Sequence, residues 1–194
     1  MMLISENVCS LAASGINRAD LFVTTKVWHD KLSPDALRRS FETSLRKLHL
    51  DHIDLFLVHW PSAKMNISAP IAVHQVEYHP FLSQTPMLDY LRRRGIPMTA
   101  YAPLAQGRAA KDPVLARIGE KHSATAAQIA IAWLLDQENV IAIPKAARSS
   151  GQRANLDALN IHLDEEDRAA IAALPKDVRY VDPPFAPDWE AATL

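Results

Sequence analysis

Residues 21–59 read LFVTTKVWHDKLSPDALRRSFETSLRKLHLDHIDLFLVH, and this stretch decides the fold class. Its first part, residues 21–27, is apolar and β-branched, which is typical of a strand. Ser33 and Pro34 then supply a helix N-cap and a first helical residue, and apolar side chains recur behind them at helical spacing: Leu37, Phe41, Leu45 and Leu48. A second, mostly apolar strand follows at residues 53–59. Strand, helix and strand in this order predict a βαβ unit in a parallel sheet.

The same alternation continues along the rest of the chain. Further strands are predicted at residues 71–78, 97–101 and 140–143, and helices begin at Thr85-Pro86 (ended by Gly95), at the capping box Thr125–Gln128, and near Ser149 and Asp164. The five glycines lie too far apart to form a dinucleotide- or phosphate-binding glycine loop, so we prefer a barrel to a doubly wound sheet. The predicted fold class is α/β: a (β/α)₈ TIM barrel that is incomplete, with about five of its eight strands, in a single domain over residues 1–194.

The connection between the second and third predicted strands is unusually short. Residues 62–70 show no helical pattern, and a parallel crossover needs at least about 10–12 residues. We therefore expect that these two strands are not neighbouring parallel partners.

The composition is that of an ordinary globular protein. The 194 residues are 48% apolar and 22% charged, with a net charge of -1, which gives no electrostatic reason to expect nucleic acid or a membrane surface as a partner. The single cysteine, Cys9, excludes an intramolecular disulfide and a multi-cysteine zinc site. There is no signal-peptide pattern and no apolar run of the ~18–20 residues that a membrane span needs, so we expect a cytoplasmic protein.

Polar side chains stand at the ends of the five predicted strands: Lys26, His59, Gln75 with Glu77, Tyr101, and Lys145. In barrels, functional residues project from the C-terminal ends of the strands, so we expect these side chains to gather at one rim. The loop behind the last strand carries Lys145, Arg148 and Arg153 ahead of a helix. Cations at a helix N-terminus favour phosphate, so this loop is either a site for a phosphorylated cofactor or a solvated basic loop.

Five motifs resemble those of the aldo-keto reductases, and they occur in that family's order: Thr24–Trp28 (TTKVW), Ile53–Pro61 (IDLFLVHWP), Gln75–Pro80 (QVEYHP), Tyr101–Leu104 (YAPL) and Ile143–Lys145 (IPK). The tail motif at residues 185–189 (FAPDW) is similar to bacterial members of the 2,5-diketo-D-gluconate reductase type. The resemblance covers nearly the whole chain. It implies a TIM barrel that reduces an aldehyde or ketone, a small-molecule carbonyl substrate, with NADPH. Hydride passes to the carbonyl carbon while a tyrosine hydroxyl donates the proton.

The resemblance also implies a role for each motif residue near the reacting centre. Lys26 matches the lysine that lowers the pKa of the catalytic tyrosine, since a neighbouring cation stabilises the phenolate. His59 matches the histidine that orients the substrate carbonyl. Gln75 matches the residue that binds the nicotinamide amide, and Tyr101 matches the ring that stacks on the nicotinamide. The cofactor-binding set further includes Pro103 and Leu104.

At the other end of the cofactor, Lys145 matches a cation near the adenosine 2′-phosphate, which favours NADP over NAD. Asn155 matches an adenine contact. Gly151 stands where the family has a second phosphate-binding arginine, and Arg148 or Arg153 is the candidate substitute. The resemblance implies no metal ligand.

Two parts of the family pattern have no counterpart in this sequence. The catalytic tyrosine and its partner aspartate lie upstream of the strand that carries Lys26, and this chain begins just before that strand. A unit of about 40 residues with further nicotinamide contacts should fall between Pro61 and Ile71, in the connection that is also too short for a crossover. We therefore expect weak or no turnover, because general acid catalysis contributes ~10²–10⁴ in rate.

Two alternatives remain open at this point. One is a catalytically impaired remnant that retains nucleotide binding or associates with itself, because open strand edges pair readily with another chain. The other is a metal-dependent hydrolase that uses His74, Glu77 and His79. Strand alternation argues against it, since it puts Glu77 and His79 on one face and His74 on the other.

Overall fold

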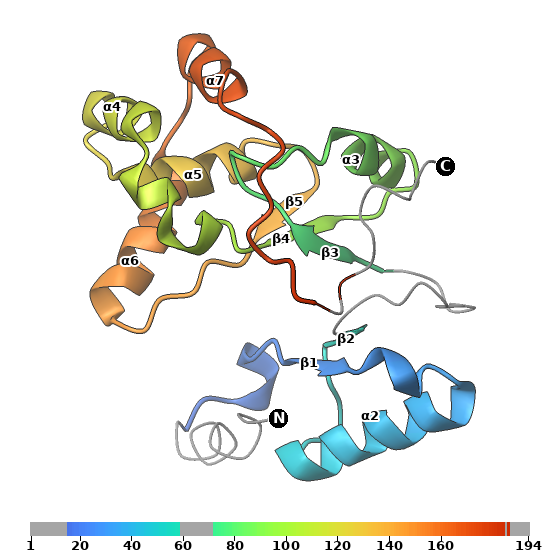
Figure 1. Ribbon diagram of the computed structural model, residues 1–194. Helices are drawn as coiled ribbons and strands as arrows, with labels where there is room; N and C mark the ends of the chain where they lie inside the picture. Colours follow the sequence, from blue (N-terminus) through green and yellow to red (C-terminus); the bar gives the residue numbers. More distant parts are fainter. Residues whose placement is uncertain (1–14, 59–71, 185, 187–194) are drawn as a thin grey trace. The chain divides into compact units, whose positions relative to one another are not determined.

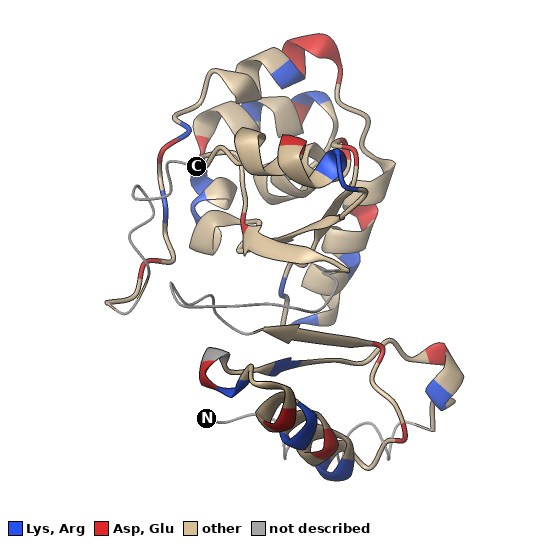
Figure 2. Ribbon diagram, turned by 90° about the vertical axis from the view of Figure 1, so that its right-hand side faces the viewer, with Lys and Arg blue, Asp and Glu red and all other residues tan. Residues whose placement is uncertain are grey.

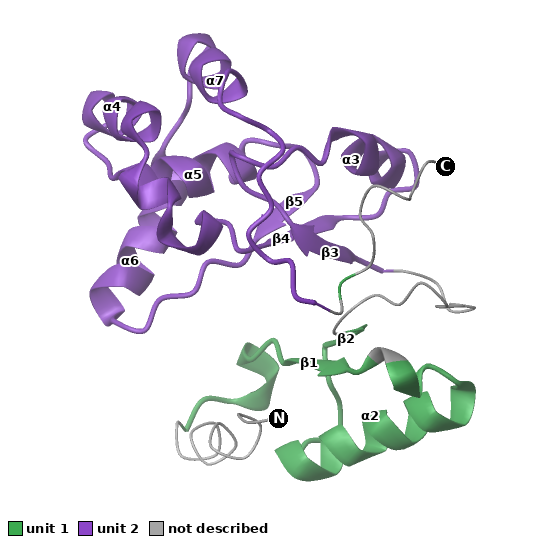
Figure 3. Ribbon diagram, viewed as in Figure 1, with its two compact units in different colours: residues 1–70, 185–194 green, residues 71–184 purple. Residues whose placement is uncertain are grey.

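The computed structural model describes residues 15–58, 72–184 and 186, and the chain forms two compact units (Figures 1 and 3). Unit 1 comprises residues 1–70 and 185–194, and unit 2 comprises residues 71–184. Each unit contains a parallel sheet and helices, which confirms the predicted α/β class. The described residues form five strands and no closed barrel. None of the helices in these stretches has the length and apolarity that crossing a bilayer requires.

Unit 1 contains a two-stranded parallel sheet covered by one helix. Strand β1 (Thr24–Val27) pairs with β2 (Leu55–Val58), and α2 (Pro34–Leu48) connects them. The 3-10 turns η1 (Arg18–Asp20) and η2 (His29–Lys31) flank β1. The ring of Phe41 on α2 meets the ring of Phe56 on β2 edge to face, with centroids 5.3 Å apart. Helix α2 therefore covers the sheet face to which Phe56 points, and the predicted βαβ unit is confirmed.

Both strands of unit 1 start later than the sequence pattern predicts. The N–H of Val23 donates to Oδ2 of Asp54 at 2.7 Å, and Arg18 Nη2 donates to the same oxygen at 2.7 Å. This side-chain bond occupies the backbone ahead of β1, so the strand begins at Thr24 instead of Leu21.

Unit 2 is built on a three-stranded parallel sheet in the order β3-β4-β5. Its strands are β3 (His74–Glu77), β4 (Met98–Tyr101) and β5 (Val140–Ala142). Its helices are α3 (Thr85–Arg92), α4 (Pro113–Lys121), α5 (Ala126–Leu135), α6 (Ser149–Asp157) and α7 (Glu165–Ala172), with 3-10 turns η3 (Ala105–Gly107), η4 (Ala109–Lys111) and η5 (Ala158–Asn160). Strands β2 and β3 belong to different sheets, as the short connection between them predicts. Figure 2 shows acidic and basic residues interspersed along the helices, in line with the net charge of -1.

Local sequence signals place the helix ends in unit 2. The Thr125 hydroxyl accepts the N–H of Gln128 at 3.3 Å and Gln128 Oε1 accepts the N–H of Thr125 at 2.9 Å, which confirms the capping box. Behind α3, Gly95 adopts a φ of 64° and its N–H donates to the carbonyl of Arg92 at 3.0 Å. The left-handed backbone conformation costs glycine little energy, because glycine has no Cβ. The predicted end of the helix at Gly95 is therefore also confirmed.

Helix α4 is not among the predicted helices, although a signal for it is present in the sequence. Asp112 precedes Pro113, and its Oδ1 accepts the N–H groups of Val114 at 2.9 Å and Leu115 at 3.0 Å. Gly119 inside the helix weakens the helical pattern. A Cβ at this position would lie 2.5 Å from the Ala124 carbonyl oxygen, so the close return of the chain requires glycine here.

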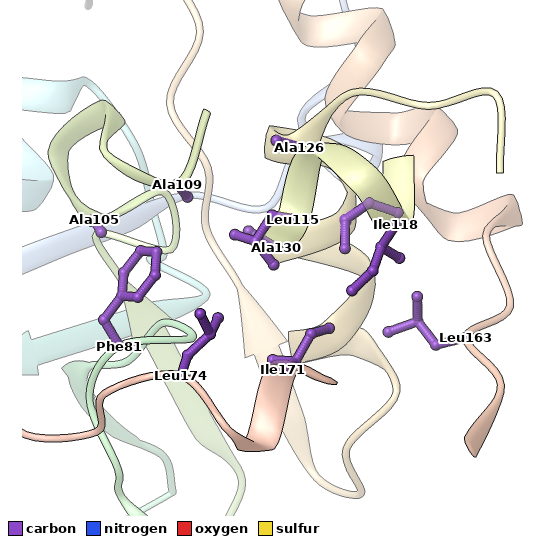
Figure 4. Packing of buried hydrophobic residues seen from close by; sticks show 11 residues of the cluster. Phe81, Ala105, Ala109, Leu115, Ile118, Ala126, Ala130, Leu163, Ile171 and Leu174 are labelled. Carbon is purple, nitrogen blue, oxygen red and sulfur yellow. The ribbon is translucent and has the colours of Figure 1, made fainter. Parts of the chain in front are cut away.

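The core of unit 2 consists of two apolar clusters. One lies between the sheet and helices α3 and α5: Tyr78, Leu88, Leu91, Met98, Ala100, Leu134 and Val140. The other joins α4, α5 and α7 to the neighbouring turns: Phe81, Ala105, Ala109, Leu115, Ile118, Ala126, Ile129, Ala130, Leu163, Ile171 and Leu174 (Figure 4). Because strand residues alternate, the sheet face away from α3 and α5 carries the remaining side chains, which are Gln75, Glu77, Thr99, Tyr101 and Ile141.

Candidate functional site

Apart from His74, the polar strand residues of unit 2 lie on the sheet face opposite α3 and α5. Gln75 is in register with Thr99, and Glu77 is in register with Tyr101. Register partners on parallel strands project to the same side, so Gln75, Glu77 and Tyr101 share one face near the C-terminal ends of two neighbouring strands. Within the described residues, the half-buried amide of Gln75 has no hydrogen-bond partner.

Tyr101 presents a neutral aromatic ring. Burial, and next the charge of Glu77, raise the pKa of its hydroxyl to about 12, while the guanidinium of Arg179 acts in the opposite direction. A group with so high a pKa is a poor proton donor near neutral pH, but its ring is available for stacking. Pro103 is buried and Leu104 half-buried in the turn that follows.

The loop between β5 and α6 carries the predicted phosphate-binding cations. Lys145 and Arg148 are both exposed, and neither has an acidic partner among the residues that the structure describes. Arg148 is the N-cap of α6, and no side chain caps this helix end. Two cations beside uncapped N–H groups suit a phosphate. A Cβ on Gly151, in the first turn of α6, would lie 3.1 Å from the Cβ of Ala146, so the helix start packs closely on the loop.

Asn155 lies one turn further along α6 and lines a cavity of about 540 Å³ between α5, β5 and α6. The amides of Gln152 and Asn155 are its polar groups, and the other lining residues are apolar: Ile131, Leu135, Ala142, Ile143, Pro144, Leu156 and Leu159. Such a hollow, mostly apolar with a few hydrogen-bonding groups, has the character of a small-molecule site.

Lys26 lies in unit 1, and the predicted site residue His59 lies outside the described residues. The Lys26 side chain is exposed and, by alternation along β1, projects away from the α2 side of its sheet. It has no ion-pair partner in the described part of the chain. The gathering of Lys26 and His59 with Gln75 and Tyr101 at one rim stays a prediction.

The proposed metal ligands do not form a site. His79 Nε2 lies 3.1 Å from Oε1 of Glu77, and both side chains are fully buried. The preceding strand residue His74 projects to the other face. Among the described residues, no three His, Cys, Asp or Glu side chains come together as a metal would require.

A segment from the C-terminal part of unit 2, which no sequence pattern predicts, reaches the end of β3. No pattern in the sequence predicts that Tyr180 lies near the site, yet its N–H donates to Oε1 of Glu77 at 2.8 Å. The other two tyrosines lie elsewhere. The hydroxyl of Tyr78 donates to Gln137 Oε1 at 2.6 Å, and burial raises its pKa. Tyr90 lies on α3, with the guanidinium of Arg94 3.8 Å from its ring centre.

Comparison with known proteins now identifies the family. The model of the Aldo/keto reductase family matches residues 3–69 and 63–176, nearly the whole chain. The chain belongs to this family. Methylglyoxal reductase DkgB from Escherichia coli O157:H7 is 35% identical over 221 residues, covering 93% of this chain and 82% of that protein. Glyoxal reductase from Bacillus subtilis (strain 168) is 33% identical over 201 residues, covering 86% of this chain and 72% of that protein.

Solved structures agree with this assignment. A crystal structure assigned as a 2,5-diketo-D-gluconic acid reductase B matches with a TM-score of 0.88 and 36% identity, over 97% of this chain and 80% of that one. An aldo-keto reductase complexed with NADPH matches with a TM-score of 0.82 and 27% identity, over 94% of this chain and 72% of that one. The fold thus matches aldo-keto reductase barrels, with five strands described here.

The comparisons also locate an internal segment that this chain lacks. The family match falls into two stretches that overlap at residues 63–69. The alignment with DkgB has 221 positions but contains 93% of 194 residues, about 180, so about 40 of its positions have no counterpart in this chain. Both findings agree with the predicted loss of about one βα unit between Pro61 and Ile71.

Proposed function

We propose that this protein binds NADPH and serves in the reduction of a small reactive carbonyl compound. One observation carries the proposal: the described part of unit 2 presents an unpaired amide at Gln75, a neutral ring at Tyr101, and cations at Lys145 and Arg148 without acidic partners. These are the groups that a nicotinamide amide, a nicotinamide ring and a 2′-phosphate require. Relatives named methylglyoxal reductase and glyoxal reductase, and an aldo-keto reductase crystallised with NADPH, support the substrate class and the cofactor.

The residues of unit 2 fit the cofactor from end to end. The Gln75 amide hydrogen-bonds the carboxamide and the Tyr101 ring stacks on the nicotinamide, with Pro103 and Leu104 completing the turn behind it. Lys145 binds the 2′-phosphate through its charge. Arg148 substitutes for the family's second phosphate-binding arginine, whose position is occupied by Gly151 in this chain. The cavity beside Asn155, with its apolar walls and two amides, accepts the adenine.

The remaining chemistry belongs to unit 1. When bound, NADPH supplies a hydride to the carbonyl carbon. In this proposal His59 orients the carbonyl oxygen. Lys26 matches the lysine that lowers the pKa of the family's proton-donating tyrosine, and that tyrosine has no counterpart in this sequence. Neither Tyr78 nor Tyr101 suits that donor, because burial raises the pKa of both. We therefore propose that the 194-residue chain turns over slowly, with a rate reduced by the factor of ~10²–10⁴ that a general acid contributes.

Nucleotide titration tests the binding part of this proposal. NADPH fluorescence is followed on addition of the protein, with NADH as the comparison ligand. Lys145→Met should weaken NADPH binding about tenfold, the loss expected for one charge-assisted phosphate contact, and change NADH binding by less than about twofold. Lys111→Met, which removes an exposed lysine of η4, is the matched control. Equal binding of NADPH by wild type and Lys145→Met, or no NADPH binding at all, would refute the assignment.

NADPH consumption with methylglyoxal tests the catalytic part. The expected wild-type rate lies at least ~10²-fold below that of an intact reductase with its general acid. A fast rate that Lys26→Met abolishes would show that the chain carries a proton donor, contrary to the proposal.

A second candidate function, self-association, is favoured by the edge of the unit 2 sheet. Strand β5 pairs only with β4 among the described residues. Ile141 on β5 is 48% exposed, and Leu156 and Leu159 beside the cavity are 57% and 62% exposed. Among the described residues, β1 likewise pairs only with β2, so it too presents an unpaired parallel edge. We propose that β5 of one copy pairs with β1 of a second copy, which satisfies both edges at once.

Sedimentation over a range of concentrations tests this association. Ile141→Lys places a charge on the edge strand and should convert an oligomer to monomer. Tyr90→Lys, a similar change at an exposed residue of α3, should leave the oligomer intact. A wild-type protein that stays monomeric at every concentration would exclude the association.

A further inference from the structure

Glu77 is a buried carboxylate to which the proposed cofactor binding gives no role. It ends β3, its side chain is fully buried, and it lies beside its register partner Tyr101 on the site face of the sheet. A carboxylate removed from water persists as a charge only where donors surround it. The donors around Glu77 therefore indicate what this charge organises.

Most of these donors come from one short backbone segment about a hundred residues away. The N–H of Tyr180 donates to Oε1 at 2.8 Å and the N–H of Val181 donates to Oε2 at 3.1 Å. Arg179 Nη1 lies 3.6 Å from Oε2. Burial raises the pKa of Glu77, but the bonds from His79 and from the two N–H groups outweigh burial and hold the pKa below its usual value. The ionised carboxylate thus binds residues 179–181 through two hydrogen bonds and an ion pair.

His79 fixes the orientation of this carboxylate. Its Nδ1 accepts the N–H of Phe81 at 3.3 Å, so in the neutral ring the proton sits on Nε2, which faces Oε1 of Glu77 at 3.1 Å. The His79 ring also packs against the ring of Tyr180, with centroids 5.4 Å apart. The pair therefore holds Tyr180 by its backbone and by its side chain.

Tyr180 is held from the β4 side as well. Gln106 Nε2 donates to the Tyr180 carbonyl at 3.0 Å, and the guanidinium of Arg108 lies 4.7 Å from the centre of its ring. Both residues belong to the turns that follow Tyr101. Residues 179–181 are thus fixed against the chain that leaves β3 and against the chain that leaves β4.

We propose that Glu77, supported by His79, is a positioning residue of the cofactor site, which locks residues 179–181 onto the ends of β3 and β4 and thereby sets the position of the Tyr101 ring. Glu77 does not touch the nucleotide and acts through Tyr101. The effect on nucleotide binding rests on the proposed function, whereas the locking of residues 179–181 does not.

Two readouts on Glu77→Gln test this role. The first is the amide hydrogen exchange of the peptide that contains Tyr180 and Val181, and the second is the NADPH dissociation constant. The variant keeps the size of the side chain but presents an NH₂ group where one backbone donor now points. Asp167→Asn is the matched control, because Asp167 is another buried carboxylate, held by His122 and Lys121 between α4 and α7.

The expected result separates positioning from general destabilisation. In Glu77→Gln, the Tyr180 and Val181 amides should exchange about tenfold faster and NADPH should bind about tenfold more weakly. Asp167→Asn should lower the melting temperature but leave both readouts within about twofold of wild type. Glu77→Asp retains the charge one methylene further back and should give intermediate values; it carries the test if Glu77→Gln does not fold.

Two results would overturn the proposal. If the Tyr180 and Val181 amides exchange in Glu77→Gln as in wild type, Glu77 does not lock the segment. If exchange accelerates but NADPH binds as in wild type, the segment does not position the cofactor site. Failure of wild type to bind NADPH would instead refute the proposed function, and the exchange measurement would still decide the locking.

Discussion

Asp167 offers the most direct test of the packing between α4 and α7. Its side chain is 3% exposed, yet it carries a charge that three donors surround. His122 Nε2 lies 2.7 Å from Oδ2, Lys121 Nζ donates to Oδ1 at 3.0 Å, and the N–H of Asp164 donates to Oδ2 at 3.1 Å. We predict that Asp167→Asn, which keeps the size and removes the charge, destabilises unit 2.

The magnitude follows from the pKa of this carboxyl. Burial raises it, but the bonds from His122 and Lys121 outweigh burial and bring the pKa of Asp167 from 3.8 down to about 2. A difference of nearly two units corresponds to about 2.5 kcal/mol. Because the pKa is lower in the folded state, this stability is fully present above about pH 4 and is lost as the pH falls towards 2.

Thermal unfolding followed by circular dichroism at pH 7, 4 and 3 provides the measurement. At pH 7 the variant should melt about 5–10 °C below wild type, and its stability should change less between pH 4 and pH 3. Glu166→Gln, at a carboxylate on the same helix that is 91% exposed, is the control and should melt within about 1 °C of wild type. If Asp167→Asn has the same melting temperature as wild type and loses as much stability between pH 4 and pH 3, the buried charge does not stabilise this interface.

Three further predictions concern single residues. Gly151→Arg adds a cation to the first turn of α6 and should tighten NADPH binding about threefold to tenfold without affecting NADH, provided that Ala146 yields a few tenths of an ångström; parallel titrations measure this. Thr125→Ala removes half of a capping box and should cost about 1 kcal/mol, seen as a lower urea midpoint at constant slope. Tyr101→Phe should remove a tyrosine that ionises near pH 12 in ultraviolet absorbance titrations. Since that pKa is raised in the folded state, wild type should also lose stability as the pH rises from about 10 towards 12, and the variant should lose less.

Much of the fold can be predicted from the sequence, because its signals are local. The alternation of residues 21–27, Ser33-Pro34 and 53–59 predicts the βαβ unit, and the capping box at Thr125 predicts the start of α5. Each of these rests on contacts within a few residues. Helix α4 escapes prediction because Gly119 interrupts its pattern, and the reason for that glycine is a contact with Ala124 that only the folded chain reveals.

The candidate site is predictable only in part. The motifs supply Gln75 and Tyr101, and alternation along paired strands is enough to place them on one face. The segment at residues 179–181 could not be predicted. Its two hydrogen bonds to Glu77 span sequence separations of 103 and 104 residues, and no local pattern in the sequence predicts contacts over such distances.

The sequence by itself determined the order of strands and helices, the family, and the position of an absent unit, because spacing, caps and motifs depend on neighbouring residues. The tertiary structure decided which charges have partners. Glu77 and Asp167 are buried and surrounded by donors, whereas Lys145 and Arg148 are exposed without acidic partners in the described part of the chain. The amino-acid composition does not distinguish these four charged residues from one another. Burial distinguishes them, because a charge removed from water must be paired within the protein, whereas an exposed one remains available to a ligand.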